Sequence, residues 1–285
     1  MNVLKTGLLL SVLTVLLVAI GQLIGGGQGA MTALIVALVI NLGSYWFSDK
    51  IVLAMYQARP LSESEAPQVY RAVREIAARN RTPMPKLYWL PTVTPNAFAT
   101  GRNPQHAAVA VTSGLLQLMN EEELKGVLAH EISHVKNRDT LVMSVAAAVA
   151  GAITMVARWA QWGMMFGGNR DDDRRGGNGA LQVVGLVLIA ILAPLAAMLI
   201  QLAISRTREY GADDSGAHLT GNPSGLASAL EKLDAAVRAH PLPNANPATA
   251  HLFIVNPLRG DAIARLFSTH QPIAERVRRL RSMRL

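Results

Sequence analysis

Two histidines and a glutamate lie within five consecutive residues, His130-Glu-Ile-Ser-His134. On a helix, residues four apart share a face, so both imidazoles can bind one metal ion from the same side. Glu131, which follows the first histidine, can then take a proton from a water molecule on that ion. This H-E-x-x-H pattern is typical of zinc metalloproteases. We therefore expect one Zn²⁺ per chain, bound by His130 and His134, with Glu131 as the general base.

A catalytic zinc site needs a third protein ligand beside an open position for water. Metzincin proteases place a third histidine six residues after the second, but that position is Thr140, so this class is excluded. The alternative is a carboxylate on a separate helix, and Glu209 is the best candidate. Asp213 follows four residues later on the same helical face and could orient a ligand imidazole. Taken alone, Glu209 could equally be a solvated acid beside Arg206 and Arg208.

Long apolar runs occupy much of the chain, and hydrophobic residues make up 51% of its 285 residues. A helix needs about 17–25 mostly apolar residues to span a bilayer. Four runs qualify, namely Leu8–Ile24, Met31–Phe47, Leu141–Ala160 and Leu181–Ile204. The last two could instead be buried helices of a soluble core. The first could be a cleaved signal peptide, but its apolar region is long for one and a second run follows at once.

The charge distribution indicates how these spans are oriented. With four spans, most of the 27 Lys and Arg residues fall on one side. Basic residues near the ends of spans favour the cytoplasmic side, so both termini and the His130–His134 segment are expected there. The absence of cysteine fits a reducing compartment. The net charge of +8 suits contact with anionic lipid. Without a recognition motif, we expect no nucleic-acid partner.

Together, the motif, the apolar runs, the charge distribution and the periodicity predict an α+β fold that is mainly α-helical. It has four transmembrane helices and a cytoplasmic zinc protease domain with a small antiparallel sheet. The expected helices are Ser62–Asn80, one that begins after Asn120 and carries both histidines, Pro223–Ala239 and Ile273–Met283. The expected strands are Lys86–Leu90, Ala97–Thr100 and His106–Thr112. Asn120-Glu-Glu-Glu123 is a capping-box pattern, which favours a helix start there.

The chain divides into four expected parts. Residues 1–50 form a transmembrane hairpin and 51–140 the first part of the catalytic domain. Residues 141–204 form a second hairpin with a loop over 161–180, and 205–285 complete the catalytic domain. Within the first catalytic part, Asn96, Ala97, Phe98 and Ala99 could form an exposed strand edge that pairs with an extended substrate. An ordinary hairpin strand is the alternative.

The chain resembles the HtpX-type membrane-bound zinc proteases of the gluzincin group, relatives of the CaaX-processing and Oma-type membrane peptidases. The matching segments span most of the chain: Pro95–Gly101, Val111–Leu115, His130–Asp139, Ser205–Asp213 and Phe267–His270. The resemblance implies that His130, His134 and Glu209 bind zinc, that Glu131 is the general base and that Asp213 supports a ligand histidine. It also implies a bacterial inner-membrane, stress-response protease that cleaves misfolded or damaged membrane proteins. Gln271 stands where the family usually has proline.

The oxyanion of peptide hydrolysis needs a hydrogen-bond donor beyond the metal. His270 is the leading candidate for that donor, with His218, His251 and Tyr210 as alternatives.

Two other classes of protein fit the motif less well. An intramembrane protease of the site-two type would bury the charged residues around the motif, among them Glu121, Lys125 and Lys136, at about 2.5–3.5 kcal/mol each. A non-catalytic zinc-binding scaffold would not need Glu131. The apolar runs that adjoin the site place it close to the bilayer. We therefore expect Glu131-assisted attack of zinc-bound water on membrane-protein or unfolded polypeptide substrates near the cytoplasmic surface.

Overall fold

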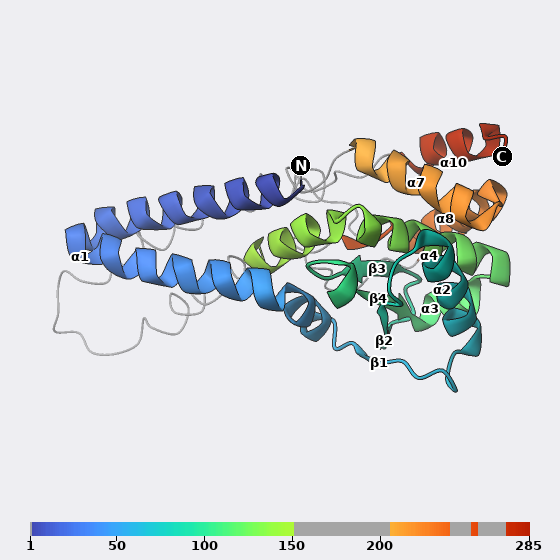
Figure 1. Cartoon of the computed structure of the whole chain (residues 1–285), viewed down its shortest axis with the longest axis horizontal. Coiled ribbons are helices and arrows are strands. Elements are labelled where there is room, and N and C mark those ends of the chain that lie inside the picture. Colours follow the sequence, from blue (N-terminus) through green and yellow to red (C-terminus); the bar gives the residue numbers. More distant parts are fainter. Residues whose placement is uncertain (1, 151–205, 240–251, 256–271) are drawn as a thin grey trace.

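A long helical hairpin projects from a group of helices that surrounds a small sheet in the computed structural model (Figure 1). The structure describes residues 2–150, 206–239, 252–255 and 272–285. Most of the predicted second hairpin lies outside these residues, including all of Leu181–Ile204 and the loop over 161–180. The third apolar run is described only as far as Ala150, within the helix Asp139–Ala150.

α1 (Asn2–Met55) turns back on itself at Gly25 and Gly26 (Figure 1). Gly26 has φ +57° and ψ −147°, a backbone conformation that a side chain disfavours. Near this turn the two arms approach closely, because a Cβ added to Gly21 would lie 2.4 Å from the carbonyl oxygen of Gly29. The glycines therefore allow both the turn and the close packing of the arms.

The hairpin accounts for the clearest membrane-like feature in the described part of the chain. Gly25–Met55, with 31 residues, is the one helical segment there that is long and apolar enough to cross a membrane. Thr6–Ala19 in the first arm is apolar but shorter. The large side chains of Ile35 and Leu42 are 57% and 62% exposed. The described residues thus identify one such helix, and the four transmembrane helices expected from the sequence are not confirmed.

The sheet has four strands in the order β1 (Arg59–Pro60), β2 (Lys86–Leu90), β4 (Ala108–Thr112) and β3 (Ala97–Thr100). β2 and β4 are parallel, whereas the other neighbours are antiparallel, so the prediction of an antiparallel sheet is wrong. The reason is that β4 enters between the two strands that precede it instead of joining the edge. Every residue of β4 is buried, which fits a central strand covered on both faces.

The helices around the sheet follow the sequence signals closely. Asn120 and Glu123 form the predicted capping box, with Asn120 Oδ1 2.9 Å from the Glu123 N–H. The first amphipathic helix begins at Pro67, later than the predicted Ser62, and proline is favoured at this position. The helices are α2 (Pro67–Asn80), α3 (Ser113–Leu118), α4 (Glu121–Lys136), α7 (Arg206–Thr220), α8 (Pro223–Ala239) and α10 (Ile273–Ser282).

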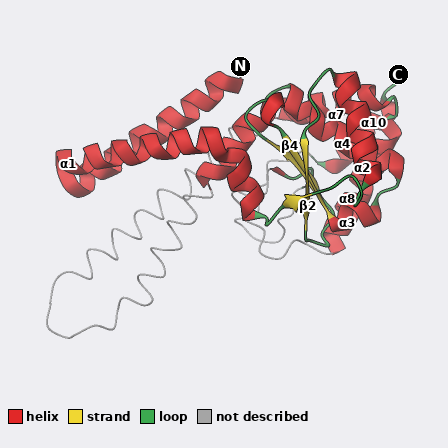
Figure 2. Cartoon of the chain, turned by 60° about the horizontal axis from the view of Figure 1, so that its bottom comes forward, coloured by secondary structure: helices red, strands yellow, loops and turns green. Residues whose placement is uncertain are grey.

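Both faces of the sheet are covered by helices (Figure 2). Side chains alternate between the faces of a strand, and β4 uses both. Val109 and Val111 pack into a core shared with α2, α4 and α8. Ala108 and Ala110 pack against the end of α1 and the helix Asp139–Ala150. The sheet therefore fixes α4 relative to the apolar hairpin.

Candidate metal centre

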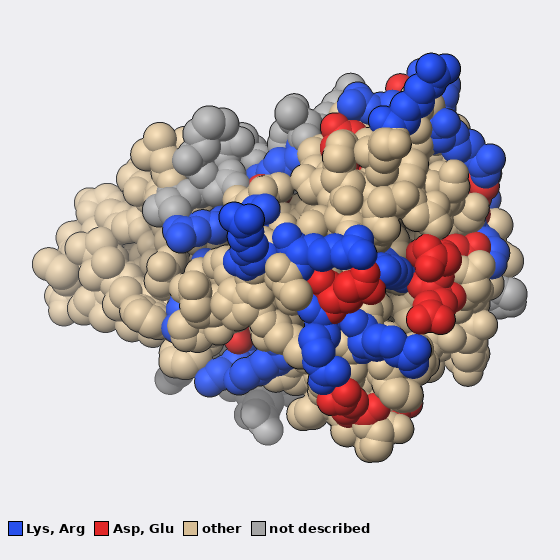
Figure 3. All heavy atoms as spheres, turned by 45° about the vertical axis from the view of Figure 1, so that its right-hand side comes forward, with Lys and Arg blue, Asp and Glu red and all other residues tan. Residues whose placement is uncertain are grey.

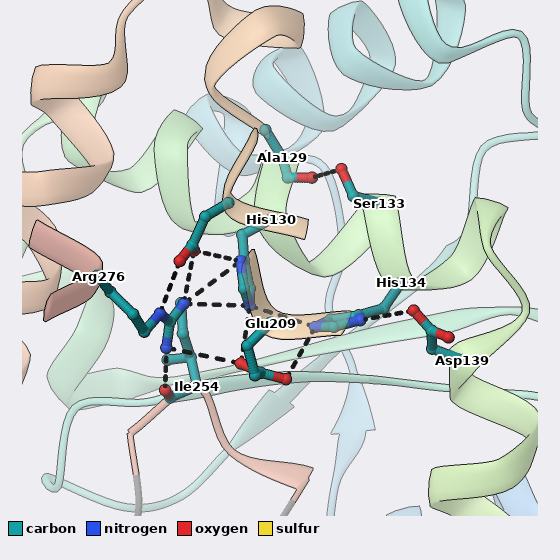
Figure 4. Close-up of polar contacts among 9 residues, drawn as sticks. Ala129, His130, Ser133, His134, Asp139, Glu209, Ile254 and Arg276 are labelled. Carbon is teal, nitrogen blue, oxygen red and sulfur yellow. Dashed lines mark hydrogen bonds and ion pairs between the residues drawn. The ribbon is translucent and has the colours of Figure 1, made fainter. Parts of the chain in front are cut away.

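The two motif histidines lie side by side on α4, as their spacing predicts (Figure 4). The Nε2 atoms of His130 and His134 are 3.3 Å apart, and the ring planes are 89° apart. Both residues are almost fully buried, with exposures of 1% and 3%.

α7 brings Glu209 to the histidines (Figure 4). The helices can approach because Gly216 of α7 lacks a side chain, and a Cβ there would lie 3.0 Å from the backbone nitrogen of His130. The Glu209 carboxylate oxygens lie 3.8 Å from His130 Nε2 and 3.6 Å from His134 Nε2. One ligand atom from each of these three residues lies within 4.8 Å of the others.

This arrangement fits a zinc ion. Zn–N and Zn–O bonds of about 2.0–2.2 Å in tetrahedral geometry place neighbouring ligand atoms about 3.3–3.6 Å apart. The Nδ1 atom of each histidine already faces a carboxylate, Asp213 or Asp139, which assigns the ring hydrogen to Nδ1. When both rings are neutral, each Nε2 directs a lone pair toward the other and toward Glu209. Buried acceptors that converge in this way repel one another unless a proton or a metal ion lies between them, so the donor set can hold a metal ion once His134 is neutral.

His130 is held by a buried carboxylate and a buried arginine. His130 Nδ1 lies 2.9 Å from Asp213 Oδ1, and Arg276 donates to both Asp213 oxygens over 2.8 and 2.7 Å. Arg276 also donates to the Ile254 carbonyl (Figure 4). Burial acts to raise the pKa of Asp213, but Arg276 and His130 hold it well below its usual range. Burial lowers the pKa of His130 despite its hydrogen bond to Asp213.

His134 has a looser counterpart of that arrangement. Its Nδ1 lies 3.2 Å from Asp139 Oδ2, and Arg208 Nε is 4.0 Å from the other Asp139 oxygen. Burial alone would lower the pKa of His134. The hydrogen bond to Asp139 and the charges of Glu209 and Glu131 outweigh burial and raise this pKa to about 8.

Glu131 points from the same helix toward β3. It is 3% exposed, and the backbone N–H of Ala99 donates to its carboxylate. Burial raises the pKa of Glu131 to about 8, and the Glu209 carboxylate adds to this rise, while His134 opposes it. Glu131 can therefore exchange a proton near neutral pH.

The other predicted site residues lie in different surroundings. Asn96, Ala97, Phe98 and Ala99 are buried, not exposed as expected for a free strand edge. Ile254 N–H donates to the Ala97 carbonyl over 3.3 Å, so the chain itself covers part of this edge. Whether a substrate pairs there stays a prediction.

None of the described residues tests His270 as the oxyanion donor. His270 and the alternative His251 lie outside the part of the chain that the structure describes. Of the other candidates, His218 is exposed and its Nδ1 lies 2.7 Å from the Asp214 carbonyl oxygen. The Arg279 guanidinium lies over the Tyr210 ring, 4.1 Å from its centroid.

Sequence reasoning missed Arg276, the most deeply buried charged residue beside the site, with 0% exposure. A signal for it existed. Arg276 lies beside Val277 on the stripe that runs from Ile273 to Leu280, where a helix of this amphipathic kind presents its apolar face. An arginine on that stripe needs a buried carboxylate partner.

Comparison with known proteins agrees with this geometry. A family model described as Peptidase family M48 matches residues 63–284. A "Protease HtpX homolog" of Syntrophobacter fumaroxidans is 59% identical, with 98% of each chain covered. Proteins of the same name from Syntrophotalea carbinolica and Pyrococcus furiosus are 58% and 56% identical, covering 99% and 98% of this chain and 99% and 95% of theirs.

A solved structure of Ste24p from S. mikatae covers 86% of this chain and 57% of its own length. The TM-score is 0.49 and the sequence identity is 19%.

Proposed function

Because this chain belongs to peptidase family M48, a family of zinc metalloproteases, we propose that it is a membrane-anchored zinc-dependent endopeptidase. We propose that it cleaves misfolded or damaged membrane proteins at the cytoplasmic face of a bacterial inner membrane. The observation that carries the proposal is the buried convergence of His130, His134 and Glu209 beside Glu131.

The charges around the centre favour one divalent cation. Four carboxylates are buried there, on Glu131, Asp139, Glu209 and Asp213. Two guanidinium groups, those of Arg208 and Arg276, lie beside them. When all are ionised, these groups carry four negative and two positive charges. Uncompensated buried charge is costly, and a single Zn²⁺ would neutralise the cluster.

Glu131 is the proposed general base. When bound, Zn²⁺ lowers the pKa of a coordinated water molecule and polarises the scissile carbonyl. Glu131 accepts a proton from the attacking water and can return it to the leaving amine. The buried position of Glu131 and its hydrogen bond from Ala99 fix the carboxylate for these transfers.

The glutamate is tested by Glu131→Gln in the purified full chain. The amide cannot accept the proton, so cleavage of a denatured membrane protein should fall by about 10²–10⁴-fold while zinc content is unchanged. Glu121→Gln is the matched control, because it removes an exposed carboxylate from the same helix and should leave both readouts unchanged. Wild-type turnover in Glu131→Gln would contradict the mechanism.

We further propose that an extended substrate lies along β3, as its closeness to Glu131 suggests. Pairing at Ala97 would require its carbonyl to exchange Ile254 for the substrate. Hydrogen exchange of the segment 252–255, measured with and without a peptide hydroxamate, tests this step. Faster exchange on binding supports pairing at Ala97, and unchanged exchange would exclude it.

The membrane location rests on α1. Its projecting end shows no charged side chain on the face in Figure 3, whereas basic and acidic side chains interleave over the rest of that face. Exposed apolar surface of this extent favours contact with lipid. Since the chain has no cysteine, Ser282→Cys would introduce a single thiol. That thiol should react with a membrane-impermeant maleimide only after intact spheroplasts are lysed, and labelling before lysis would contradict a cytoplasmic domain.

A further inference from the structure

We infer that Arg208 and Asp139 form a positioning pair that holds His134 in its metal-binding orientation. The inference rests on the proposed metal centre and concerns residues outside the ligand set and the general base.

Asp139 is placed to fix the His134 ring. It is 2% exposed, and its Oδ2 lies 3.2 Å from His134 Nδ1 (Figure 4). A carboxylate that accepts the Nδ1 hydrogen leaves the Nε2 lone pair for the metal and limits rotation of the ring. Asp139 is also the first residue of the helix Asp139–Ala150, so the packing of that helix against the sheet holds it in place.

Arg208 is placed to fix Asp139. It precedes Glu209 on α7, its side chain is 12% exposed, and its Nε lies 4.0 Å from Asp139 Oδ1. Its two terminal nitrogens are buried without a hydrogen-bond partner among the described residues. Burial of a guanidinium without hydrogen bonds costs free energy unless a nearby opposite charge compensates for it. The positive charge of Arg208 attracts the Asp139 carboxylate and so helps to hold it where it faces His134 Nδ1.

The charge balance of the site separates a positioning role of Arg208 from a role of its charge alone. Without Arg208, the four buried carboxylates would outnumber Arg276 and one divalent cation by one negative charge. Excess negative charge would not by itself weaken zinc binding, so any loss of affinity in an Arg208 variant must come from misplacement of Asp139 and His134. If Arg208 acted through its charge alone, its removal would leave zinc binding unchanged or make it tighter. If Arg208 positions Asp139 and His134, its removal should weaken zinc binding.

The test is zinc affinity of the full chain in detergent, measured by competition with a chelator, which does not depend on cleavage. Asp139→Asn should weaken affinity by about 10–100-fold, as expected for partners of metal-binding histidines. Arg208→Gln should weaken it by about 10-fold. Arg208→Lys should restore most of the loss, because it returns the charge beside Asp139.

The double variant Asp139→Asn/Arg208→Gln separates a pair from two independent residues. If Arg208 acts through Asp139, the double variant binds zinc no more weakly than Asp139→Asn alone. Arg238→Gln, which breaks an exposed pair with Asp234, is the control and should bind zinc as the wild type does. Unchanged or tighter zinc binding in Arg208→Gln, or additive losses in the double variant, would overturn the inference.

Folding and metal geometry are read separately. The melting temperature of each metal-free variant shows whether it is folded, and the visible spectrum of the Co²⁺-substituted protein reports ligand geometry. A folded Arg208→Gln with an altered Co²⁺ spectrum supports positioning, and one with the wild-type spectrum counts against it. If the wild type binds zinc but cleaves no polypeptide, the proposed function fails while the affinity results still decide the inference.

Discussion

The two histidines of the metal centre are supported in the same way but with different tightness. His130 is backed by Asp213, which Arg276 binds through two hydrogen bonds of 2.7 and 2.8 Å. His134 is backed by Asp139 at 3.2 Å, and Arg208 approaches only to 4.0 Å. All three nitrogens of the Arg276 guanidinium donate hydrogen bonds, whereas the two terminal nitrogens of Arg208 have no hydrogen-bond partner among the described residues.

The difference follows from where each support originates. Asp213 and Arg276 come from α7 and α10, and Ile254 adds a carbonyl to Arg276, so three separate segments meet behind His130. Asp139 begins the helix Asp139–Ala150, directly after the turn at Arg138, where φ is +58°. Arg208 of α7 approaches this carboxylate only to 4.0 Å. The position of Asp139 therefore depends mainly on the junction between α4 and the apolar helix. We expect the residues behind His130 to contribute most to the free energy of unfolding. We expect the protonation of His134 to make zinc binding depend on pH.

Asp213→Asn should have the largest effect, because it leaves the Arg276 charge buried without its carboxylate. Breaking a buried pair of this kind costs about 3–5 kcal/mol. Zinc affinity should also fall by about 100-fold as His130 loses its orienting acceptor. Urea unfolding and chelator competition measure the two effects. Asp214→Asn, one residue away, is the matched control. If Asp213→Asn lowered stability and zinc affinity no more than Asp214→Asn does, the residues behind His130 would not be the more strongly stabilising ones.

Arg276→Lys should have an intermediate effect. Lysine keeps the charge but cannot donate to both Asp213 oxygens and the Ile254 carbonyl in the same planar geometry. We expect a loss of about 1.5–3 kcal/mol in the free energy of unfolding, typical of hydrogen bonds to charged groups. Arg278→Lys is the comparison, since Arg278 is 76% exposed on the same helix. Equal stabilities would show that charge alone suffices.

The pH response should be the smallest and most specific difference. The pKa values of Glu131 and His134 are both raised to about 8, so the stability they give to the metal-free protein is present in acid and lost as pH rises through 8. The pKa of Asp213 is lowered, so its contribution is lost only in strong acid. Zinc binding must displace the protons on the His134 side.

Chelator competition between pH 6 and 9 measures this response. Apparent zinc affinity should rise with pH and level off above about 8. In Glu131→Gln the rise should end at lower pH, because the glutamate no longer raises the pKa of His134. Affinity that does not change with pH would contradict a protonated His134 side.

Local signals predicted the parts of the fold that depend on neighbouring residues. The capping box at Asn120 marks the start of α4, and Pro223–Ala239 has the predicted bounds. Loop lengths could not predict that β4 lies between β2 and β3. The strand order depends on which strand is buried at the centre of the sheet, and this is set by packing against the helices.

In the candidate site too, contacts within one helix could be predicted from residue spacing, whereas contacts between helices could not. Helical spacing places His130 and His134 together, and the four-residue step places Glu209 and Asp213 on one face. The apolar stripe of α10 marks Arg276 as buried, but its partner Asp213 lies on α7, and no spacing rule joins these two helices.

The most direct test of the metal centre is elemental analysis of the purified full chain together with Glu209→Gln. We predict one zinc per wild-type chain, and loss of both zinc and peptide cleavage in the variant. Cleavage by the wild type should stop on zinc removal and return when zinc is restored. Undiminished cleavage by zinc-free protein, or full zinc content in Glu209→Gln, would contradict a catalytic zinc bound by Glu209.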